Sequence, residues 1–357
     1  MTLVDTRRIP RTLVLAALVA VATVIPAAAQ VCGPFGDAPR AMVTDTTVLT
    51  CAGGTMMPSW TDADGTSRTA CLYEPASASS MNPLPLVVYV HPSLFTADTI
   101  SAVTNILSFQ TTADLTGDPA RPGFIVVAPE GRATTHFYPT PDDQGTGWDN
   151  WYRQLEKHGR DVEVGGTTYA QNVDAAAIDH FIDAEVATGK VDPRRIYVTG
   201  WSNGAAMGML YALNRRRIAA AAVYTAPDAF EAFNDPCPQA PVSRRARSNA
   251  EIRLSNKRVP IYHVHNACDI AGICPNGEQL LGDLLGIHAR VTDVIIDGSQ
   301  MQVTTCDAGC GTNPDGDMSP VDNPRGFTEG STNHVRWPTN WTASMLDFFR
   351  QHRGHGH

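Results

Sequence analysis

Apolar runs and helical stretches alternate along most of this 357-residue chain. Apolar runs are typical of strands covered on both faces, and they occur at residues 86–90, 123–129, 196–199 and 218–224. A further strand is expected at residues 259–265. Helical spacing of apolar residues predicts helices at 102–115, 172–188, 205–214, 278–287 and 342–352. A shorter strand is expected at 67–73, and residues 132–170 are expected to form loops. The alternation predicts an α/β fold, in which helices cover both faces of a mainly parallel sheet.

The N-terminus carries the pattern of an export signal. Three arginines within the first eleven residues precede an apolar run at 13–25, and Ala27-Ala28-Ala29 then supplies a small-residue cleavage site. This order predicts a secretory signal peptide at residues 1–29. The run is shorter than the roughly 20 residues that a membrane-spanning helix needs, so a membrane anchor is the weaker alternative. We therefore expect a secreted protein, extracellular or periplasmic, without a stable membrane anchor.

Composition and charge narrow the class of protein. The hydrophobic content of 43% is ordinary for a globular chain. The formal charge of −9 offers no basic surface for nucleic acid, so nucleic-acid binding is not expected. No internal repeat or long linker interrupts residues 30–357, which predicts a single domain with cysteines in its first segment.

All the cysteines follow the predicted signal peptide, at positions 32, 51, 71, 237, 268, 274, 306 and 310. An even number of cysteines in an exported chain predicts disulfides, but the sequence leaves their pairing open. The close neighbours Cys268/Cys274 and Cys306/Cys310 are candidate local pairs. The chain has no C-x-x-C pair with matching histidines, so no metal site is expected.

Residues 200–204, Gly-Trp-Ser-Asn-Gly, fit the pattern G-x-S-x-G. They lie between a predicted strand and a predicted helix, which is the context that a nucleophile elbow requires. Such a turn lifts the serine hydroxyl clear of the sheet, and the flanking glycines relieve crowding between strand and helix. Five-residue patterns also occur by chance, so an ordinary strand–helix turn is the alternative. We expect Ser202 to be a nucleophile.

A serine nucleophile needs a histidine to take its proton and a carboxylate to orient that histidine. On sheets of this kind the chain order is serine, acid, histidine. Asp269 follows the strand at 259–265 and is therefore the expected acid. An aspartate that caps a turn is the alternative interpretation, and Asp283, Asp293 and Asp297 are weaker rivals.

His334 is the expected base, because it lies late in the chain, in a loop before the last helix. A surface loop histidine is the alternative, and His288 is the main rival. His263 and His265 alternate along a predicted strand and are expected to be structural. The C-terminal histidines are expected to form a tail rather than a metal site.

The reaction also needs hydrogen-bond donors for the oxyanion. The N–H of Asn203 is one expected donor, because it directly follows the nucleophile. Ser93, after the strand at 86–90, is the other, since Pro92 has no N–H. A plain turn at the end of that strand is the alternative.

Aromatic residues could line a substrate pocket near this turn. Trp148, Trp151, Trp201 and Trp337 are the candidates for the acyl or alcohol pocket, with core packing as an equal alternative. The Asp-Gly-Asp run at 315–317 lacks the full spacing of a calcium loop, so a solvated loop is expected there.

Four blocks of the chain together resemble exported α/β-hydrolases of the feruloyl esterase and polyhydroxybutyrate depolymerase group. The blocks are residues 86–91, 124–131, 191–204, and His334 with Trp337-Pro338. The resemblance runs from about residue 69 to the final helix, and its most specific block is 191–204. It implies an α/β-hydrolase catalytic domain over residues 30–357, with Ser202, Asp269 and His334 as the triad and Ser93 in the oxyanion loop.

The expected function is the hydrolysis of carboxylic esters by a secreted serine esterase through an acyl-enzyme, without a cofactor. The resemblance implies feruloyl-esterase-like substrates first and a polyester depolymerase second, so the expected partner is a small or polymeric ester. A peptidase has the same triad, because the triad alone does not separate esters from amides. A non-catalytic secreted binding protein on the same fold is the alternative of another class.

Overall fold

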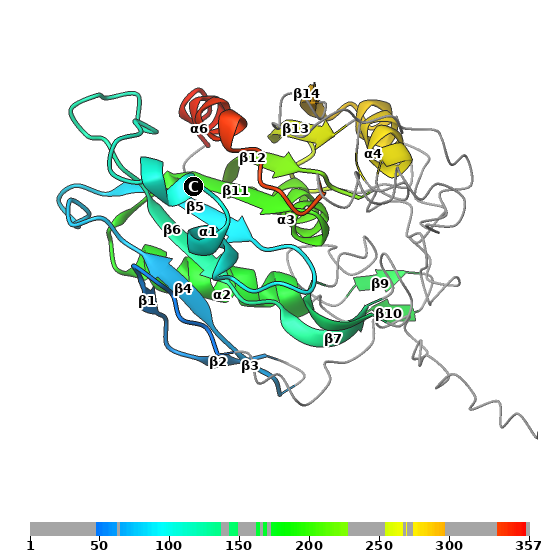
Figure 1. Cartoon of the computed structure of the whole chain (residues 1–357), viewed down its shortest axis with the longest axis horizontal. Helices are drawn as coiled ribbons and strands as arrows, with labels where there is room; N and C mark the ends of the chain where they lie inside the picture. The colour runs from blue at the N-terminus through cyan, green and yellow to red at the C-terminus, as the bar shows by residue number, and fades with distance from the viewer. Residues whose placement is uncertain are drawn as a thin grey trace, which may run out of the picture. The chain divides into compact units, whose positions relative to one another are not determined.

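The computed structural model describes residues 48–62, 65–136, 143–148, 162–164, 167–169, 173–227, 254–266, 269, 274–296 and 334–354. Within these residues, the strands of the main sheet are β1 (Thr55–Met56), β4 (Ala70–Tyr73), β5 (Leu84–Val90), β6 (Ile125–Pro129), β11 (Val191–Trp201), β12 (Ile218–Tyr224), β13 (Pro260–Asn266) and β14 (Arg290–Ile296). Their order across the sheet is β1-β4-β6-β5-β11-β12-β13-β14 (Figure 1). Strand β4 is antiparallel to both of its neighbours, and all pairs from β6 to β14 are parallel.

Helices pack on both faces of this sheet, as the alternation of strands and helices predicts. The described helices are α1 (Thr99–Ala102), α2 (Val173–Ala187), α3 (Asn203–Asn214), α4 (Cys274–Gly286) and α6 (Thr342–Arg350), with 3-10 turns at Ile106–Phe109 and Thr339–Trp341. Helices α2, α3 and α4 share one core cluster with the sheet, and α1 and α6 share the other. In the part of the chain that the structure describes, none of the helices has the length and apolarity of a membrane span.

The two cores follow from the alternation of side chains along each strand. Leu86 and Val88 of β5 belong to the cluster under α2 and α3, whereas Val87 and Tyr89 belong to the cluster under α6. Every residue of β5 is buried, which explains its unbroken apolar pattern. The sheet therefore separates two cores, and polar residues beyond the strand ends are left to form sites.

The predicted helix at residues 102–115 is wrong. The structure has only α1 and one 3-10 turn in and just before this segment. Hydroxyl and carboxylate side chains take backbone partners here: Thr104 donates to the Ile100 carbonyl, and Asp114 accepts from the Thr116 and Gly117 amides. Such local bonds offer the backbone an alternative to helical pairing.

Several strand predictions also need correction. The segment at 67–73 forms two strands, because β3 (Ser67–Arg68) pairs with β2 (Trp60–Thr61) and β4 pairs with β6. In place of an unbroken loop at 132–170, the structure has the pairs β7 (Arg132–His136) with β8 (Asp143–Gly147) and β9 (Val162–Val164) with β10 (Thr167–Tyr169). Strand β14 was missed, because at the edge of the sheet it mixes polar and apolar positions. The other predicted helices agree with α2, α3, α4 and α6 to within a few residues.

One disulfide joins the N-terminal segment to the sheet. Cys51 bonds Cys71 of β4, with Cα atoms 5.2 Å apart. The prediction of disulfides is confirmed for this pair, whose partners the sequence had left open. The candidate pairs that involve Cys268, Cys306 and Cys310 lie outside the described residues and stay predictions.

Candidate active site

Ser202 lies at the turn between β11 and α3, in a backbone conformation that few residues adopt. Its φ is 55° and its ψ is −125°, outside the regions that non-glycine residues favour. The Ser202 N–H donates to the Tyr224 carbonyl at the end of β12 over 3.0 Å, and the Ser202 carbonyl accepts from the Ala205 amide over 2.8 Å. The neighbouring strand and the new helix therefore hold both sides of the strained turn.

Close backbone contacts explain the two glycines of this turn. A Cβ atom on Gly200 would lie 2.4 Å from the Gly204 carbonyl oxygen, and one on Gly204 would lie 2.2 Å from the His91 carbonyl oxygen. Neither distance is possible unless the backbone moves. The G-x-S-x-G pattern is therefore a consequence of how closely α3 packs against the ends of β11 and β5.

The side chains predicted as nucleophile, base and acid are hydrogen-bonded in series. Ser202 Oγ lies 2.9 Å from His334 Nε2, and His334 Nδ1 lies 2.8 Å from Asp269 Oδ1. A carboxylate accepts, so Nδ1 carries the proton and Nε2 accepts from the Ser202 hydroxyl. The Asp269 side chain is 1% exposed and the His334 side chain is 15% exposed. Such an arrangement can move a proton from Ser202 to His334 and hold the resulting charge beside Asp269.

Thr225 holds the second oxygen of Asp269, a contact that the sequence does not predict. The Thr225 hydroxyl donates to Asp269 Oδ2, and the Thr225 N–H donates to the Val264 carbonyl over 2.7 Å. Thr225 is fully buried with a φ of 51°, a rare conformation for a β-branched residue. Its only signal in the sequence is its place directly after a buried strand, and many residues share that feature.

The Trp201 indole supports the backbone of the residue that carries the predicted base. Its Nε1–H donates to the His334 carbonyl over 2.8 Å, and its ring meets that of Trp337 edge-on at 6.2 Å. The Tyr224 ring lies 6.4 Å from that of Trp201. Burial, and then the negative charge of Asp269, raise the pKa of Tyr224, so its hydroxyl stays neutral.

The loop after β5 reaches the start of α3, where the sequence predicts the oxyanion donors. Asn203 is the first residue of α3, so its N–H has no acceptor within the helix. Across the described residues, neither this N–H nor that of Ser93 has a hydrogen-bond acceptor. The close approach of Gly204 to the His91 carbonyl brings the loop that carries Ser93 to this end of α3.

His91 connects loops instead of acting as a free base. Its Nδ1–H donates to the Pro92 carbonyl over 2.7 Å, and its Nε2 accepts the Gly131 N–H over 2.8 Å. The His91 carbonyl accepts from Trp148 Nε1 over 2.8 Å. The Asn203 side chain bonds the Trp148 N–H at 2.8 Å and the Trp148 carbonyl at 3.1 Å. The ends of β5, β8 and β11 are therefore tied together around the turn.

Three of the four tryptophans predicted to line a pocket lie within the described residues. Trp148, Trp201 and Trp337 are almost completely buried, and each indole N–H already has an acceptor. In this conformation they form the framework around Ser202. Contact of these residues with a substrate stays a prediction, and Trp151 lies outside the described residues.

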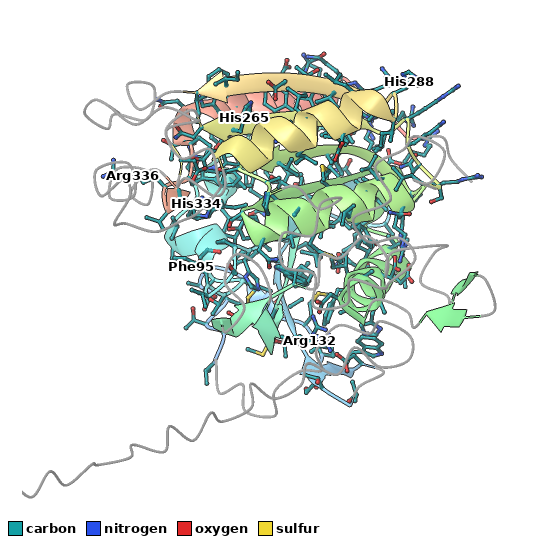
Figure 2. All side chains as sticks on the ribbon, turned by 90° about the vertical axis from the view of Figure 1, so that its right-hand side faces the viewer. Phe95, Arg132, His265, His288, His334 and Arg336 are labelled. Carbon is teal, nitrogen blue, oxygen red and sulfur yellow. A yellow bond between two sulfur atoms is a disulfide. The ribbon has the colours of Figure 1, made fainter. Side chains whose placement is uncertain are left out.

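Apolar side chains that face solvent come from the two loops beside Ser202. Leu94 is 58% exposed, Phe95 37% and Val335 48%. The Phe95 ring stacks on Trp201 with centroids 6.0 Å apart, and Val335 directly follows His334. Figure 2 shows Phe95 and His334 on neighbouring segments. No pattern in the sequence predicts this apolar surface, because single apolar residues in loops are common.

The rivals for base and acid are placed elsewhere. His288 is exposed at the end of α4 that lies away from His334 (Figure 2). Asp293 bonds two histidines of β13, and Asp283 lies on α4. Asp297 lies outside the described residues, as does the Asp-Gly-Asp run.

Two groups of side chains in the described part of the chain have ligand atoms spaced for a metal ion. The first is Cys51, Cys71 and Asp98, in which the sulfur atoms are joined as a disulfide and Asp98 accepts the Cys51 N–H over 2.7 Å. The second is the pair of histidines on β13 with Asp293 of β14. Neither of these two groups includes Ser202, Asp269 or His334.

The sheet order and the strained turn define an α/β-hydrolase fold. When only the strands of the main sheet are numbered, their order is 1-2-4-3-5-6-7-8, and Ser202 directly follows the fifth. The hydrogen-bonded residues follow in the chain order serine, aspartate, histidine, as they do on such sheets. The predicted fold class is confirmed.

No protein-family model matches the sequence, and no curated protein matches it. Among solved structures, a thermostable esterase is 14% identical, with 85% of this chain and 64% of that chain covered and a TM-score of 0.47. An S-formylglutathione hydrolase from Agrobacterium tumefaciens is 14% identical, with coverage of 88% and 100% and a TM-score of 0.49. A Pyrococcus horikoshii acylaminoacyl peptidase is 12% identical, with coverage of 85% and 42% and a TM-score of 0.45. At these scores the likenesses carry no argument about substrate or mechanism.

Proposed function

We propose that the protein is a serine hydrolase of carboxylic esters, with Ser202 as nucleophile, His334 as general base and Asp269 as the orienting acid. The observation that carries the proposal is the series of hydrogen bonds of 2.9 and 2.8 Å on a strained turn. Ser202 attacks the ester carbonyl while His334 takes its proton and then passes that proton to the leaving alcohol. Water, activated by His334 in the same way, releases the acid from the acyl-enzyme.

In this mechanism the backbone amides of Asn203 and Ser93 hold the oxyanion. Both amides lack acceptors among the described residues, which supports the assignment. The N-terminus of α3 adds a partial positive charge at the same place. Loss of one such donor typically costs about 10²–10³ in kcat.

The exposed apolar side chains of Leu94, Phe95 and Val335 suit the apolar part of an ester. We propose feruloyl-type aryl esters as the first substrate class and a polyhydroxybutyrate-type polyester as the second. The resemblance of residues 86–91, 124–131 and 191–204 supports this order.

The export of the protein from the cytoplasm is also a proposal. We propose that residues 1–29 direct export and are removed. The N-terminal pattern supports this, and so does the Cys51–Cys71 disulfide, because disulfides persist mainly outside the cytoplasm.

The test compares the wild type, Ser202→Ala and the matched control Ser108→Ala, which changes an exposed serine of the 3-10 turn. Acid release is measured from methyl ferulate, p-nitrophenyl butyrate and a polyhydroxybutyrate film. We expect Ser202→Ala to lower kcat by about 10⁴–10⁶-fold and Ser108→Ala to change it less than twofold. A fluorophosphonate probe should label the wild type and leave Ser202→Ala unlabelled.

Two outcomes would replace the proposal. Folded wild type that releases no acid and takes no probe points to a binding protein. Labelling without ester cleavage, together with cleavage of an acyl-peptide, points to a peptidase.

A further inference from the structure

His263 and His265 of β13 face Asp293 of the neighbouring strand β14. Alternate residues of a strand point to the same face, so both imidazoles lie on one side of the sheet. The parallel register pairs His263 directly with Asp293, which puts the carboxylate beside both rings. The rings stack with centroids 4.9 Å apart and planes 18° from parallel. The pairing of the two strands therefore preforms the group, without any loop.

One carboxylate accepts from both imidazoles. His263 Nδ1 lies 2.8 Å from Asp293 Oδ1, and His265 Nε2 lies 3.2 Å from Asp293 Oδ2. His263 is fully buried and His265 is 3% exposed, whereas the Asp293 side chain is 21% exposed. The group is therefore closed toward the core and open to solvent beside Asp293.

The hydrogen bonds to Asp293 use only the inner nitrogen of each ring. The outer ring nitrogens, His263 Nε2 and His265 Nδ1, are buried and have no partner in the described structure. Each outer nitrogen can hold the single proton of a neutral ring, which leaves the lone pair of the inner nitrogen free for an ion. Helix α4 packs against this side of His265, since a Cβ on Gly277 would be in van der Waals contact with His265 Nδ1 at 3.7 Å. Figure 2 shows His265 beside this helix.

We propose that His263 Nδ1, His265 Nε2 and the Asp293 carboxylate bind a divalent first-row transition metal, with zinc as the reference ion. The ligand atoms all lie within 4.8 Å of one another. Ligand atoms on a tetrahedral zinc lie about 3.4 Å apart, given bonds of about 2.0–2.2 Å. The contacts of 2.8 and 3.2 Å therefore need to open by about 0.6 Å or less. Each imidazole stays neutral on binding, because its proton moves to its outer nitrogen.

The donor set selects the metal and its role. Imidazole nitrogen suits zinc, cobalt and iron, whereas calcium and magnesium prefer oxygen alone. The ion would join the edge strand β14 to β13, the strand that leads toward Asp269. Its role is therefore to stabilise this part of the sheet, and the inference does not depend on the proposed ester hydrolysis.

The experiment measures metal binding by the full chain after treatment with a chelator. We expect one zinc per chain at saturation, a visible cobalt spectrum of the four-coordinate type, and no competition by magnesium or calcium. The Tm should rise with the logarithm of free zinc. His265→Gln and Asp293→Asn should each weaken zinc binding by at least about 100-fold, because loss of even an outer-shell partner costs about 10–100-fold.

The matched control is the triple variant His352→Gln/His355→Gln/His357→Gln, which removes the C-terminal histidines. This variant and Ser202→Ala should bind zinc as the wild type does. Saturable binding that disappears in the triple variant, or that persists unchanged in His265→Gln, overturns the proposal. If His265→Gln and Asp293→Asn do not fold, the test rests on the triple variant. A triple variant without a cobalt band and without saturable zinc binding then rejects the proposed site.

Discussion

Removal of the Thr225 hydroxyl tests whether the second oxygen of Asp269 must be held for the proposed reaction. Thr225 donates to Oδ2 while His334 donates to Oδ1, so the carboxylate is fixed from two sides. Thr225→Val keeps the shape of the side chain and removes only the donor. Without it, the carboxylate can rotate and lose its alignment with the imidazole. The variant should therefore impair proton transfer while the apolar loops beside Ser202 stay in place.

The expected loss of kcat in Thr225→Val follows from the charge of the acceptor, the Asp269 carboxylate. A hydrogen bond to a charged group contributes about 1.5–3 kcal/mol. If the whole effect falls on the transition state, kcat drops by about 10–150-fold, since about 1.4 kcal/mol corresponds to a factor of ten. KM should change little, because Thr225 is fully buried and cannot touch the substrate. The control Thr225→Ser retains the hydroxyl and should keep kcat within about threefold of the wild type.

The assay is steady-state hydrolysis of p-nitrophenyl butyrate, with the Tm of each variant measured to confirm folding. Equal losses in Thr225→Val and Thr225→Ser would show that the methyl group or the strained backbone matters, and not the donor. A kcat of Thr225→Val close to that of the wild type would refute the reasoning, because Asp269 would then be held without Thr225.

Three further changes test other parts of the structure. Gly204→Ala should lower the free energy of unfolding, measured in urea titrations, by at least about 2–3 kcal/mol, because the new Cβ would lie 2.2 Å from backbone. The control Gly282→Ala lies on α4 with open space around it, and it should raise that free energy by up to about 1 kcal/mol. Burial raises the pKa of Glu185 from 4.5 to about 6, so the unfolded chain ionises first and the wild type loses stability as pH rises through this window. Glu185→Gln should therefore gain in Tm over the wild type between pH 4.5 and 7, and a pH-independent difference would contradict this. Replacement of Cys51 and Cys71 by serine should lower the free energy of unfolding by about 3 kcal/mol for a loop of this length, and an unchanged urea midpoint would contradict it.

The inner strands of the sheet could be predicted because they are buried on both faces. Residues 218–224 form β12 with the predicted bounds, since burial requires apolar side chains at every position. Strand β14 could not be recognised, because one of its faces meets solvent and its charged residues interrupt the pattern. The predicted helix at 102–115 failed for a different reason: apolar spacing was present, but polar side chains took the backbone partners that a helix needs.

The site was predictable to the extent that its signals are local in the sequence. The turn at Ser202 has a local signature, because its glycines are required by contacts within the strand–turn–helix unit and with β5. Asp269 and His334 have weaker signals, namely their chain order, the strand end before Asp269 and the loop that carries His334. No local pattern in the sequence points to Thr225 as a partner of Asp269, because this contact depends on how β12 and β13 pair. The alternation of His263 and His265 along a strand predicts a structural role, but their contact with Asp293 depends on β14, which the sequence does not predict.

The proposed nucleophile and the proposed acid are positioned by the same backbone pairing that builds the sheet. Ser202, Thr225 and Asp269 follow three neighbouring parallel strands in order. Beyond the strand ends, the Ser202 N–H still bonds the Tyr224 carbonyl, and the Thr225 N–H still bonds the Val264 carbonyl. His334 does not follow one of these strands, and it is held by Asp269 and by the Trp201 indole N–H. Side-chain changes at Trp201 should therefore displace His334, the proposed base, more than Ser202, which the strand pairing holds.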